Sequence, residues 1–535
     1  MEEKVCVIGF DGATFDLIEP FMKRGLLPHF QKLLDEGASA SLISVIPPVS
    51  APAWVSLATG KNPGIHNIYG FTDGKGRIVN STFRRSKALW NLLDEHGKRS
   101  ILINVPMTSP PEDINGIQIS GILSPHEKGF SGRFEIDKES IMDKEKTLAK
   151  MFQWEITKTE RALHMLKTEK WDLFFIVYHL SDFVPTIYWK YMDVNHPQYV
   201  LDDALSHAVE DAYRVLDDIL GRFLSALDSN THVVVVSDHG MGPSTRVFNI
   251  NEWLRQEGFL HVKAAAMEKA LSPEKVAALI EKHALIRRLV KMVPESFQKK
   301  AYRLIFSRSK NVFRRIETQS SSAYAYSHAH FASIWLVNKD NEKENKNRNR
   351  NKNEIKNINE IESKNDKKKK NEDILSLIEK KIKKFKDPET GEKVITHVYR
   401  RDHIFHGASV DSAPDLVVEA LPHYSIRSQR LGSLFSEPLQ SGDHRMNGIF
   451  IAYGPHIKKD RLGDISIFDV CPTLLAILGL PVPSDMDGNI KEIFEEGFQV
   501  RKEVPESQRY VQQQPYTEEE ENTIKDRLSA LGYFD

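Results

Sequence analysis

Short apolar runs alternate with longer amphipathic stretches along the first half of the chain. Four runs are continuous and rich in β-branched or aromatic residues, as is typical of buried strands: residues 4–10, 100–105, 173–177 and 233–236. Between them, residues 17–36 and 199–227 carry apolar positions at helical spacing. Pro20 and Pro28 predict that the first of these helices is broken. This alternation predicts an α/β fold with a mainly parallel central sheet flanked by helices.

The pattern changes after residue 262. Residues 263–308 are rich in Ala, Lys and Leu at helical spacing without a strand-like run, which predicts a helical cap insertion. Later segments return to the earlier pattern, with strand-like runs at residues 333–337, 415–419 and 448–453 and a helical stretch at residues 470–478. We therefore expect one sheet interrupted by insertions rather than several independent domains.

Residues 339–373 are of low complexity, dominated by Asn and Lys. Few aliphatic residues occur there, so the segment predicts a disordered loop that cannot offset its chain entropy by burial. A basic arm for nucleic acid is the alternative, but acidic residues are almost as frequent as basic ones.

The expected organisation of the chain is therefore as follows: α/β core at 1–262, cap at 263–320, core strand region at 321–338, loop at 339–373, second part of the core at 374–495, and a polar tail at 496–535 with a short helix at 518–531.

The amino-acid composition excludes several classes of protein. The 535 residues carry 73 Lys and Arg against 74 Asp and Glu, so a net charge of -1 offers no global basic field for nucleic acid or an anionic membrane. Only Cys6 and Cys471 are present, which excludes a disulfide scaffold and a cysteine zinc cluster. Neither a signal peptide nor a stretch long enough to span a membrane is visible, so we expect a soluble, cytoplasmic protein.

Three of the strand-like runs lead to an aspartate: Asp11, Asp182 and Asp238. Carboxyl ends of parallel strands meet at one edge of a sheet, so these carboxylates are expected to converge. Like charges repel at such range unless a cation lies between them, and His239 adds an imidazole. Oxygen and imidazole ligands without thiolate suit zinc, manganese or iron. A single such aspartate is as often a helix cap or turn former, and Asp182 carries the weakest signal.

Ser50 and His444 are further candidates. The prolines before Ser50 predict an extended approach and an abrupt helix start, where unpaired N–H groups favour an anion such as a serine alkoxide or its phosphate ester. Ser50 as a simple N-cap is the alternative. His444 follows Asp443 in a polar loop before a strand, where a lone histidine is usually a surface residue.

Taken together, these motifs resemble the alkaline phosphatase superfamily and, more closely, its type I phosphodiesterase/nucleotide pyrophosphatase branch. The resemblance covers most of the chain and rests on these segments: residues 5–11, 47–60, 172–193, 233–254 and 414–488. It implies a hydrolase of phosphodiester or pyrophosphate bonds acting on a small phosphorylated or nucleotide substrate. Trp54 argues against a sulfatase, because sulfatases need an arginine at this position. The chain also lacks a visible second-domain pattern of cofactor-independent phosphoglycerate mutases, which argues against that family.

The same resemblance implies a site with one or two divalent metal ions, zinc or manganese, and Ser50 as the nucleophile. Asp11, Asp238 and His239 would bind the first ion together with Ser50, and Asp182 and His444 the second. The family normally has a histidine at the position of Thr186, so the second site is expected to be weak, empty, occupied by a harder cation, or completed by another residue such as His179. A phosphotransferase or mutase, and a non-catalytic metal-binding protein, are the alternative functions.

Overall fold

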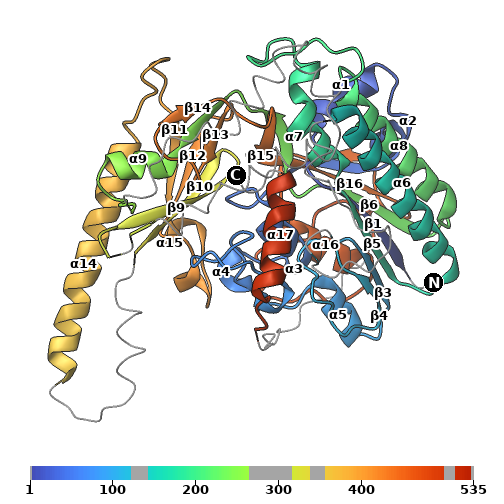
Figure 1. Ribbon diagram of the computed structural model, residues 1–535. Helices are drawn as coiled ribbons and strands as arrows, with labels where there is room; N and C mark the ends of the chain where they lie inside the picture. Colours follow the sequence, from blue (N-terminus) through green and yellow to red (C-terminus); the bar gives the residue numbers. More distant parts are fainter. Residues whose placement is uncertain are drawn as a thin grey trace. The chain divides into compact units, whose positions relative to one another are not determined.

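The computed structural model describes residues 3–121, 124, 143–263, 316–317, 319–337, 356–498 and 513–531. The chain divides into two compact units (Figure 1). The first is built from Met1–Thr245, Asp402–Ala413 and Gln440–Phe534, and the second from Arg246–Arg401 and Pro414–Leu439. The cap expected at residues 263–308 falls outside the described residues except for Lys263.

A nine-stranded sheet forms the centre of the first unit. Its strands are, in spatial order, β17 (Asp460–Arg461), β2 (Ala38–Ile43), β16 (Asn447–Tyr453), β6 (Thr231–Val236), β1 (Lys4–Phe10), β5 (Leu173–Tyr178), β3 (Ser100–Ile103) and β4 (Gly116–Ile119), with β18 (Ile465–Ser466) also paired to β2. Only β16 runs antiparallel to its neighbours among these described strands. The predicted α/β fold with a mainly parallel sheet is therefore confirmed.

The register of β1 aligns the ends of three strands. Gly9 pairs with Val177 of β5 on one side and with Val236 of β6 on the other. The residues that follow β1, β5 and β6 consequently emerge side by side at one edge of the sheet, where ligand sites of open parallel sheets lie.

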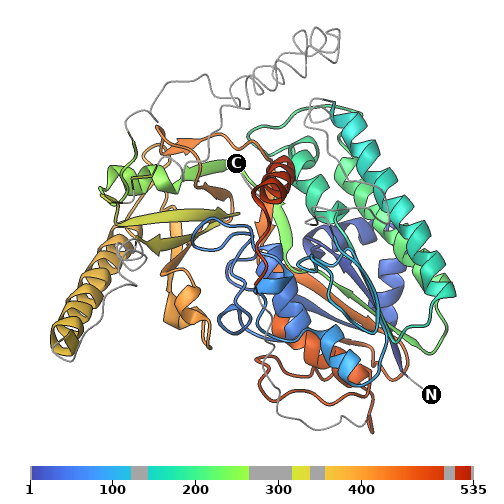
Figure 2. The same ribbon diagram turned by 60° about the horizontal axis from the view of Figure 1, so that its bottom comes forward.

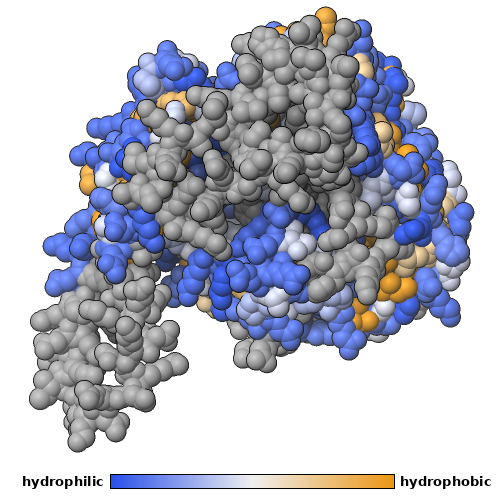
Figure 3. Space-filling model, in the orientation of Figure 1, coloured by the Kyte–Doolittle hydropathy of each residue, from blue (hydrophilic) through white to orange (hydrophobic). Residues whose placement is uncertain are grey.

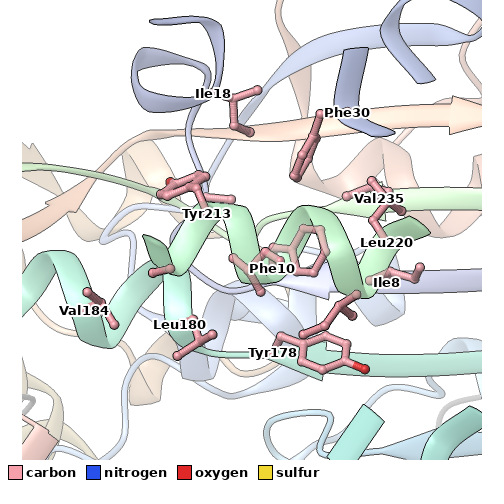
Figure 4. Close-up of a cluster of buried hydrophobic side chains, with 14 of the residues drawn as sticks. Ile8, Phe10, Ile18, Phe30, Tyr178, Leu180, Val184, Tyr213, Leu220 and Val235 are labelled. Atoms are coloured by element: carbon pink, nitrogen blue, oxygen red, sulfur yellow. The ribbon is translucent and has the colours of Figure 1, made fainter. Parts of the chain in front are cut away.

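Alternating residues of β1 bury two hydrophobic faces. Cys6, Ile8 and Phe10 face a cluster that Figure 4 shows in part. This face is covered by α1 (Phe15–Lys23), α2 (Pro28–Glu36), α6 (Lys144–Thr168), α7 (Leu180–Met192) and α8 (Ala208–Ala226). Val5 and Val7 face the other cluster, which α3 (Ser50–Thr59), α5 (Leu89–Glu95) and α16 (Val470–Ile477) cover (Figure 2).

The predicted break in the first helical stretch is confirmed, but it lies at Gly25 and not at Pro20. Helix α1 runs through Pro20, and the chain turns where Gly25 adopts a positive φ of 74°. Pro28 then occupies the first position of α2, where its missing N–H costs nothing. The sequence pattern predicts that the next long helix begins at residue 199, but helix α8 begins at Ala208.

The expectation of one interrupted sheet is wrong, because the second unit has sheets of its own. Its four-stranded antiparallel sheet has the order β11 (Ile395–Arg400), β12 (Leu416–Ala420), β10 (Phe331–Leu336) and β9 (Ala323–His328). A three-stranded sheet contains β13 (Tyr424–Arg427), β8 (Arg246–Asn249) and β14 (Phe435–Ser436). The runs at residues 333–337 and 415–419 therefore pair with each other, and they share a separate core with α9 (Ile250–Gln256).

The expectation of a disordered loop at residues 339–373 is wrong for its second half. Helix α14 (Lys356–Ile382) begins inside this segment, while residues 338–355 lie outside the described ones. The last turns of α14 bury Leu375, Ile378 and Ile382 in the core of the second unit. This docking stabilises the helix from its carboxyl end, and the lysines before it have good helix propensity.

The remaining elements of the first unit are short or peripheral. They are the two-stranded antiparallel sheet of β7 (Gly240–Pro243) and β15 (Gly442–Arg445), the helices α4 (Pro63–His66), α15 (Arg401–Ile404) and α17 (Glu518–Leu531), and the 3-10 turns η1 (Ser81–Phe83), η5 (Val410–Ser412) and η6 (Ile467–Asp469). The face shown in Figure 3 is mostly hydrophilic where it is coloured. Within the described part of the chain, every helix is too short or too polar to cross a membrane.

Candidate metal and nucleophile site

Three of the predicted site residues follow neighbouring strands of the nine-stranded sheet. Asp11 comes directly after β1, Asp238 comes after β6 and Ser237, and Asp182 lies in the first turn of α7, which follows β5. The backbone N–H of Asp11 continues the β1–β5 pairing by donating to the carbonyl of Tyr178 at 2.9 Å. All three carboxylates are buried.

Gly12 allows these three segments to approach closely. Its φ is +74°, and a Cβ there would lie 3.0 Å from the Cα of Asp182. The N–H of Gly12 points to Oδ1 of Asp238 at 3.4 Å. A larger residue would push α7 away from the end of β1 and separate the carboxylates.

Ser50 is the first residue of α3, and Val49 occupies the cap position. The alternative of Ser50 as an N-cap is therefore wrong. Its Oγ lies 3.3 Å from Nε2 of His239, and that nitrogen lies within 3.5 Å of carboxylate oxygens of Asp11 and Asp238. The dipole of the helix N-terminus favours negative charge at this point.

His444 reaches the site on β15, where it pairs with Met241 of β7. Its Nδ1 lies 2.9 Å from the carbonyl oxygen of Pro48, which can only accept, so Nδ1 carries the proton. The other ring nitrogen, Nε2, lies 3.4 Å from Oδ1 of Asp182. A histidine that looked like a surface residue in the sequence is thus buried and oriented.

The six predicted residues lie together, and their ligand-type side chains form two overlapping groups. Asp11, Asp238 and His239 make one group, and Asp182, His239 and His444 the other, with the ligand atoms of each group within 4.8 Å of one another. His239 belongs to both.

Neither Thr186 nor His179 belongs to the second group. Thr186 lies one turn after Asp182 on α7 and offers no imidazole. His179 belongs to neither group, and its Nδ1 lies 3.2 Å from Oδ2 of Asp11.

Burial and mutual charge perturb these side chains strongly. Burial, together with the charges of Asp11 and Asp182, raises the pKa of Asp238 well above its usual value. Burial also raises the pKa of Asp11, but contacts with His179, His239 and Trp54 outweigh it, so that this pKa is lowered.

The pKa values of His239 and His444 shift in opposite directions. Burial and the charge of His444 lower the pKa of His239 to about 4. For His444, burial alone would lower the pKa, but the hydrogen bond and charge of Asp182 raise it to about 8.

The residues present fit a divalent cation. Within the described part of the chain, Oδ1 of Asp11 and Oδ2 of Asp238 are buried without a hydrogen bond, and both lie within 3.5 Å of Nε2 of His239. A cation between them would neutralise the buried negative charge that raises the pKa of Asp238. Two carboxylates and one imidazole form a ligand set that zinc accepts.

Sequence reasoning missed the contact of Trp54. Its indole N–H donates to Oδ2 of Asp11 at 2.9 Å, and both side chains are buried. The available signal was the spacing, because Trp54 follows Ser50 by four residues on α3 and so lies on the same side of the helix.

Known structures share this fold. A structure of murine ectonucleotide pyrophosphatase/phosphodiesterase 5 matches with a TM-score of 0.50 and 14% identity, covering 92% of this chain and 100% of that chain. Its inactive variant in complex with AMP matches with a TM-score of 0.50, 15% identity and the same coverage. A comparison with curated proteins gives no match.

A sequence profile described as "Type I phosphodiesterase / nucleotide pyrophosphatase" matches residues 5–341, which is more than half of the chain. These residues include Asp11, Ser50, Asp182, Asp238 and His239. The chain therefore belongs to the type I phosphodiesterase/nucleotide pyrophosphatase family and is a phosphoric ester hydrolase.

Proposed function

We propose that this protein hydrolyses a phosphodiester or pyrophosphate bond of a nucleotide or similar small substrate, with Ser50 as the nucleophile. The observation that carries the proposal is the position of the Ser50 hydroxyl, 3.3 Å from Nε2 of His239 at the start of α3. The hydroxyl is buried beside the imidazole that belongs to both ligand groups. The nucleotide part rests on the family and on the AMP bound to the murine relative's inactive variant.

A divalent cation would be held by Asp11, Asp238 and His239, beside Ser50. When bound, such a cation lowers the pKa of a neighbouring hydroxyl and neutralises charge on phosphate oxygens. Zinc suits this ligand set, and manganese is the alternative.

Ser50 then performs the first displacement. Its Oγ gives up its proton and forms a bond to phosphorus while the bond to the leaving oxygen breaks in line, the leaving oxygen takes up a proton, and the result is a phosphoseryl or nucleotidyl-seryl intermediate. The N-terminus of α3 stabilises the negative charge of this ester. Water then attacks the same phosphorus, its proton goes to the departing Ser50 oxygen, and the product phosphate leaves.

We further propose that one cation binds tightly and a second only weakly. His239 Nε2 belongs to both ligand groups, and one imidazole nitrogen binds one ion. Once His239 serves the first group, only Asp182 and His444 remain for a second ion. Catalytic zinc sites usually have three protein ligands, and Thr186 does not supply the missing one.

The test compares Ser50→Ala with Ser56→Ala, a buried serine of the same helix whose hydroxyl contacts His66 instead. Both variants should retain tight zinc binding. Only Ser50→Ala should lose hydrolysis of a chromogenic phosphodiester and of the corresponding monoester.

Two results would contradict the proposal. Near-wild-type turnover by Ser50→Ala would remove Ser50 as the nucleophile. A wild-type protein that binds zinc but hydrolyses neither ester, nor a dinucleotide pyrophosphate, would indicate a non-catalytic member of the family.

A further inference from the structure

The two carboxylate oxygens of Asp11 have different surroundings. Oδ1 lies 3.5 Å from Nε2 of His239 and faces the ligand group. Oδ2 accepts the indole N–H of Trp54 at 2.9 Å and lies 3.2 Å from Nδ1 of His179. Oδ1 thus faces the cation position, whereas Oδ2 contacts the rings of Trp54 and His179.

Trp54 reaches Oδ2 of Asp11 through a space that exists because Gly9 has no side chain. Its ring packs over Gly9 of β1, where an added Cβ would lie 2.5 Å from the ring atom Cη2. Phe175 of β5 contacts the same ring, with 6.0 Å between the ring centroids. The indole is 1% exposed, so its orientation is fixed by packing.

This contact also links the nucleophile to the ligand group. Trp54 follows Ser50 by one helical turn on α3, and Asp11 directly follows β1. The bond from Trp54 to Asp11 therefore sets how close the start of α3 lies to the end of β1.

His179 is held as firmly as Trp54. Its backbone N–H donates to Oε1 of Glu155 at 2.7 Å. Its ring stacks on Phe183, with 5.1 Å between centroids and 18° between planes. Glu155 in turn pairs with Lys158, and both side chains are buried. These contacts place Nδ1 3.2 Å from Oδ2 of Asp11, and His179 belongs to neither ligand group.

We propose that Trp54 and His179 are positioning residues that hold Asp11 by Oδ2, so that Oδ1 alone binds the cation. The inference rests on the proposed cation at Asp11, Asp238 and His239. Groups that orient a metal ligand from outside typically contribute about 10- to 100-fold to metal affinity or activity. His179 then serves the tight cation indirectly and is not a ligand of the second one.

The first test is Trp54→Phe, which removes the indole N–H and keeps an aromatic ring over Gly9. Trp90→Phe is the matched control, because Trp90 is equally buried but its indole N–H has no hydrogen bond within the described part of the chain. Zinc affinity of the metal-depleted protein, measured by competition with a chromophoric chelator, should fall about 10- to 100-fold for Trp54→Phe and stay unchanged for the control.

Turnover should separate the two variants as well. We expect kcat of zinc-saturated Trp54→Phe to fall more than KM changes, because Asp11 and the start of α3 move apart while the rest of the substrate site is kept. Equal melting temperatures for the two variants would show that lost packing does not explain the difference. Unchanged zinc affinity in Trp54→Phe would overturn the role of the indole.

The second test concerns His179. His179→Phe keeps the stacking on Phe183 and removes Nδ1, so it should weaken the tight zinc equivalent, whereas His179→Asn returns a donor near the Nδ1 position and should restore part of the affinity. Loss of the weak equivalent instead, with the tight one unchanged, would make His179 a ligand of the second cation and overturn the proposal. Zinc binding is measured without substrate, so a wild-type protein that binds zinc without hydrolysing esters would refute the proposed function and leave this inference standing.

Discussion

His239 and His444 stack face to face, with 3.7 Å between the ring centroids and 17° between the ring planes. His239 lies between β6 and β7, and His444 lies in β15, which pairs with β7. Their stacking brings the two ligand groups together, because His239 contributes to both. Positive charge on both imidazoles would be repulsive at this distance, which agrees with the opposite directions of their pKa shifts.

The raised pKa of His444, about 8, predicts a pH dependence of zinc binding. Below pH 8 the imidazole holds a proton that zinc must displace, so the affinity of the weaker equivalent should fall about tenfold per pH unit as the pH decreases. His239, with a lowered pKa of about 4, stays neutral over this range and adds no such dependence to the tight equivalent. Calorimetric titration at pH 6, 7 and 8 measures both equivalents, and a pH-independent weak equivalent would contradict the assignment of His444.

Thr186→His should strengthen the second cation site. The new imidazole lies one turn after Asp182 on α7 and offers a third ligand beside His444. We expect the weak zinc equivalent to tighten and diesterase activity to rise, while Thr186→Val, which adds no ligand, changes neither. Two equally tight equivalents in the wild-type protein would show that Thr186 is not a defect.

The docking of α14 predicts that substitutions at two neighbouring residues have very different effects on the free energy of unfolding. Ile378 is fully buried in the core of the second unit, whereas Leu377 is 45% exposed. Ile378→Ala should lower the free energy of unfolding of this unit by about 2–5 kcal/mol, and Leu377→Ala by less than about 0.5 kcal/mol. Urea denaturation followed by circular dichroism checks this, and equal effects of both substitutions would mean that α14 does not dock in this way.

The C-terminal helix α17 should matter for the nucleophile. Leu528 is buried in the same hydrophobic cluster as Val49 and Ala51, the residues on either side of Ser50. Leu528→Ala should lower the melting temperature and the activity together, because the cluster supports the start of α3. Ser529→Ala, at an exposed neighbouring position, is the control. Full activity in Leu528→Ala despite a lower melting temperature would separate α17 from the site.

Much of the fold could be predicted because the elements have strong patterns of their own. The strand Lys4–Phe10 and the helix Glu518–Leu531 agree with the residues expected. The division into separate sheets could not be predicted, because an apolar run such as 333–337 looks the same whichever sheet it joins. Helix α14 was missed because the residues it is seen to bury, Leu375, Ile378 and Ile382, lie beyond the segment dominated by Asn and Lys.

The gathering of the site residues could be anticipated for a physical reason. Carboxylates after parallel strands converge wherever those strands lie side by side, and Asp11 and Asp238 do so. The contacts of Trp54 and His179 with Asp11 could not be anticipated in the same way. Spacing puts Trp54 on the same side of α3 as Ser50, but the contacts themselves depend on the gap above Gly9 and on the ring orientation set by Phe183, which are properties of packing.

The stereochemical course at phosphorus tests the central claim, nucleophilic attack by Ser50, most directly. Each in-line displacement inverts the configuration, so attack by Ser50 followed by attack of water gives net retention. Hydrolysis of a phosphorothioate diester of known configuration in ¹⁸O-labelled water, followed by configurational analysis of the product, measures this course. We predict retention for the zinc-loaded wild-type protein, and inversion would show that water attacks directly and that Ser50 is not the nucleophile.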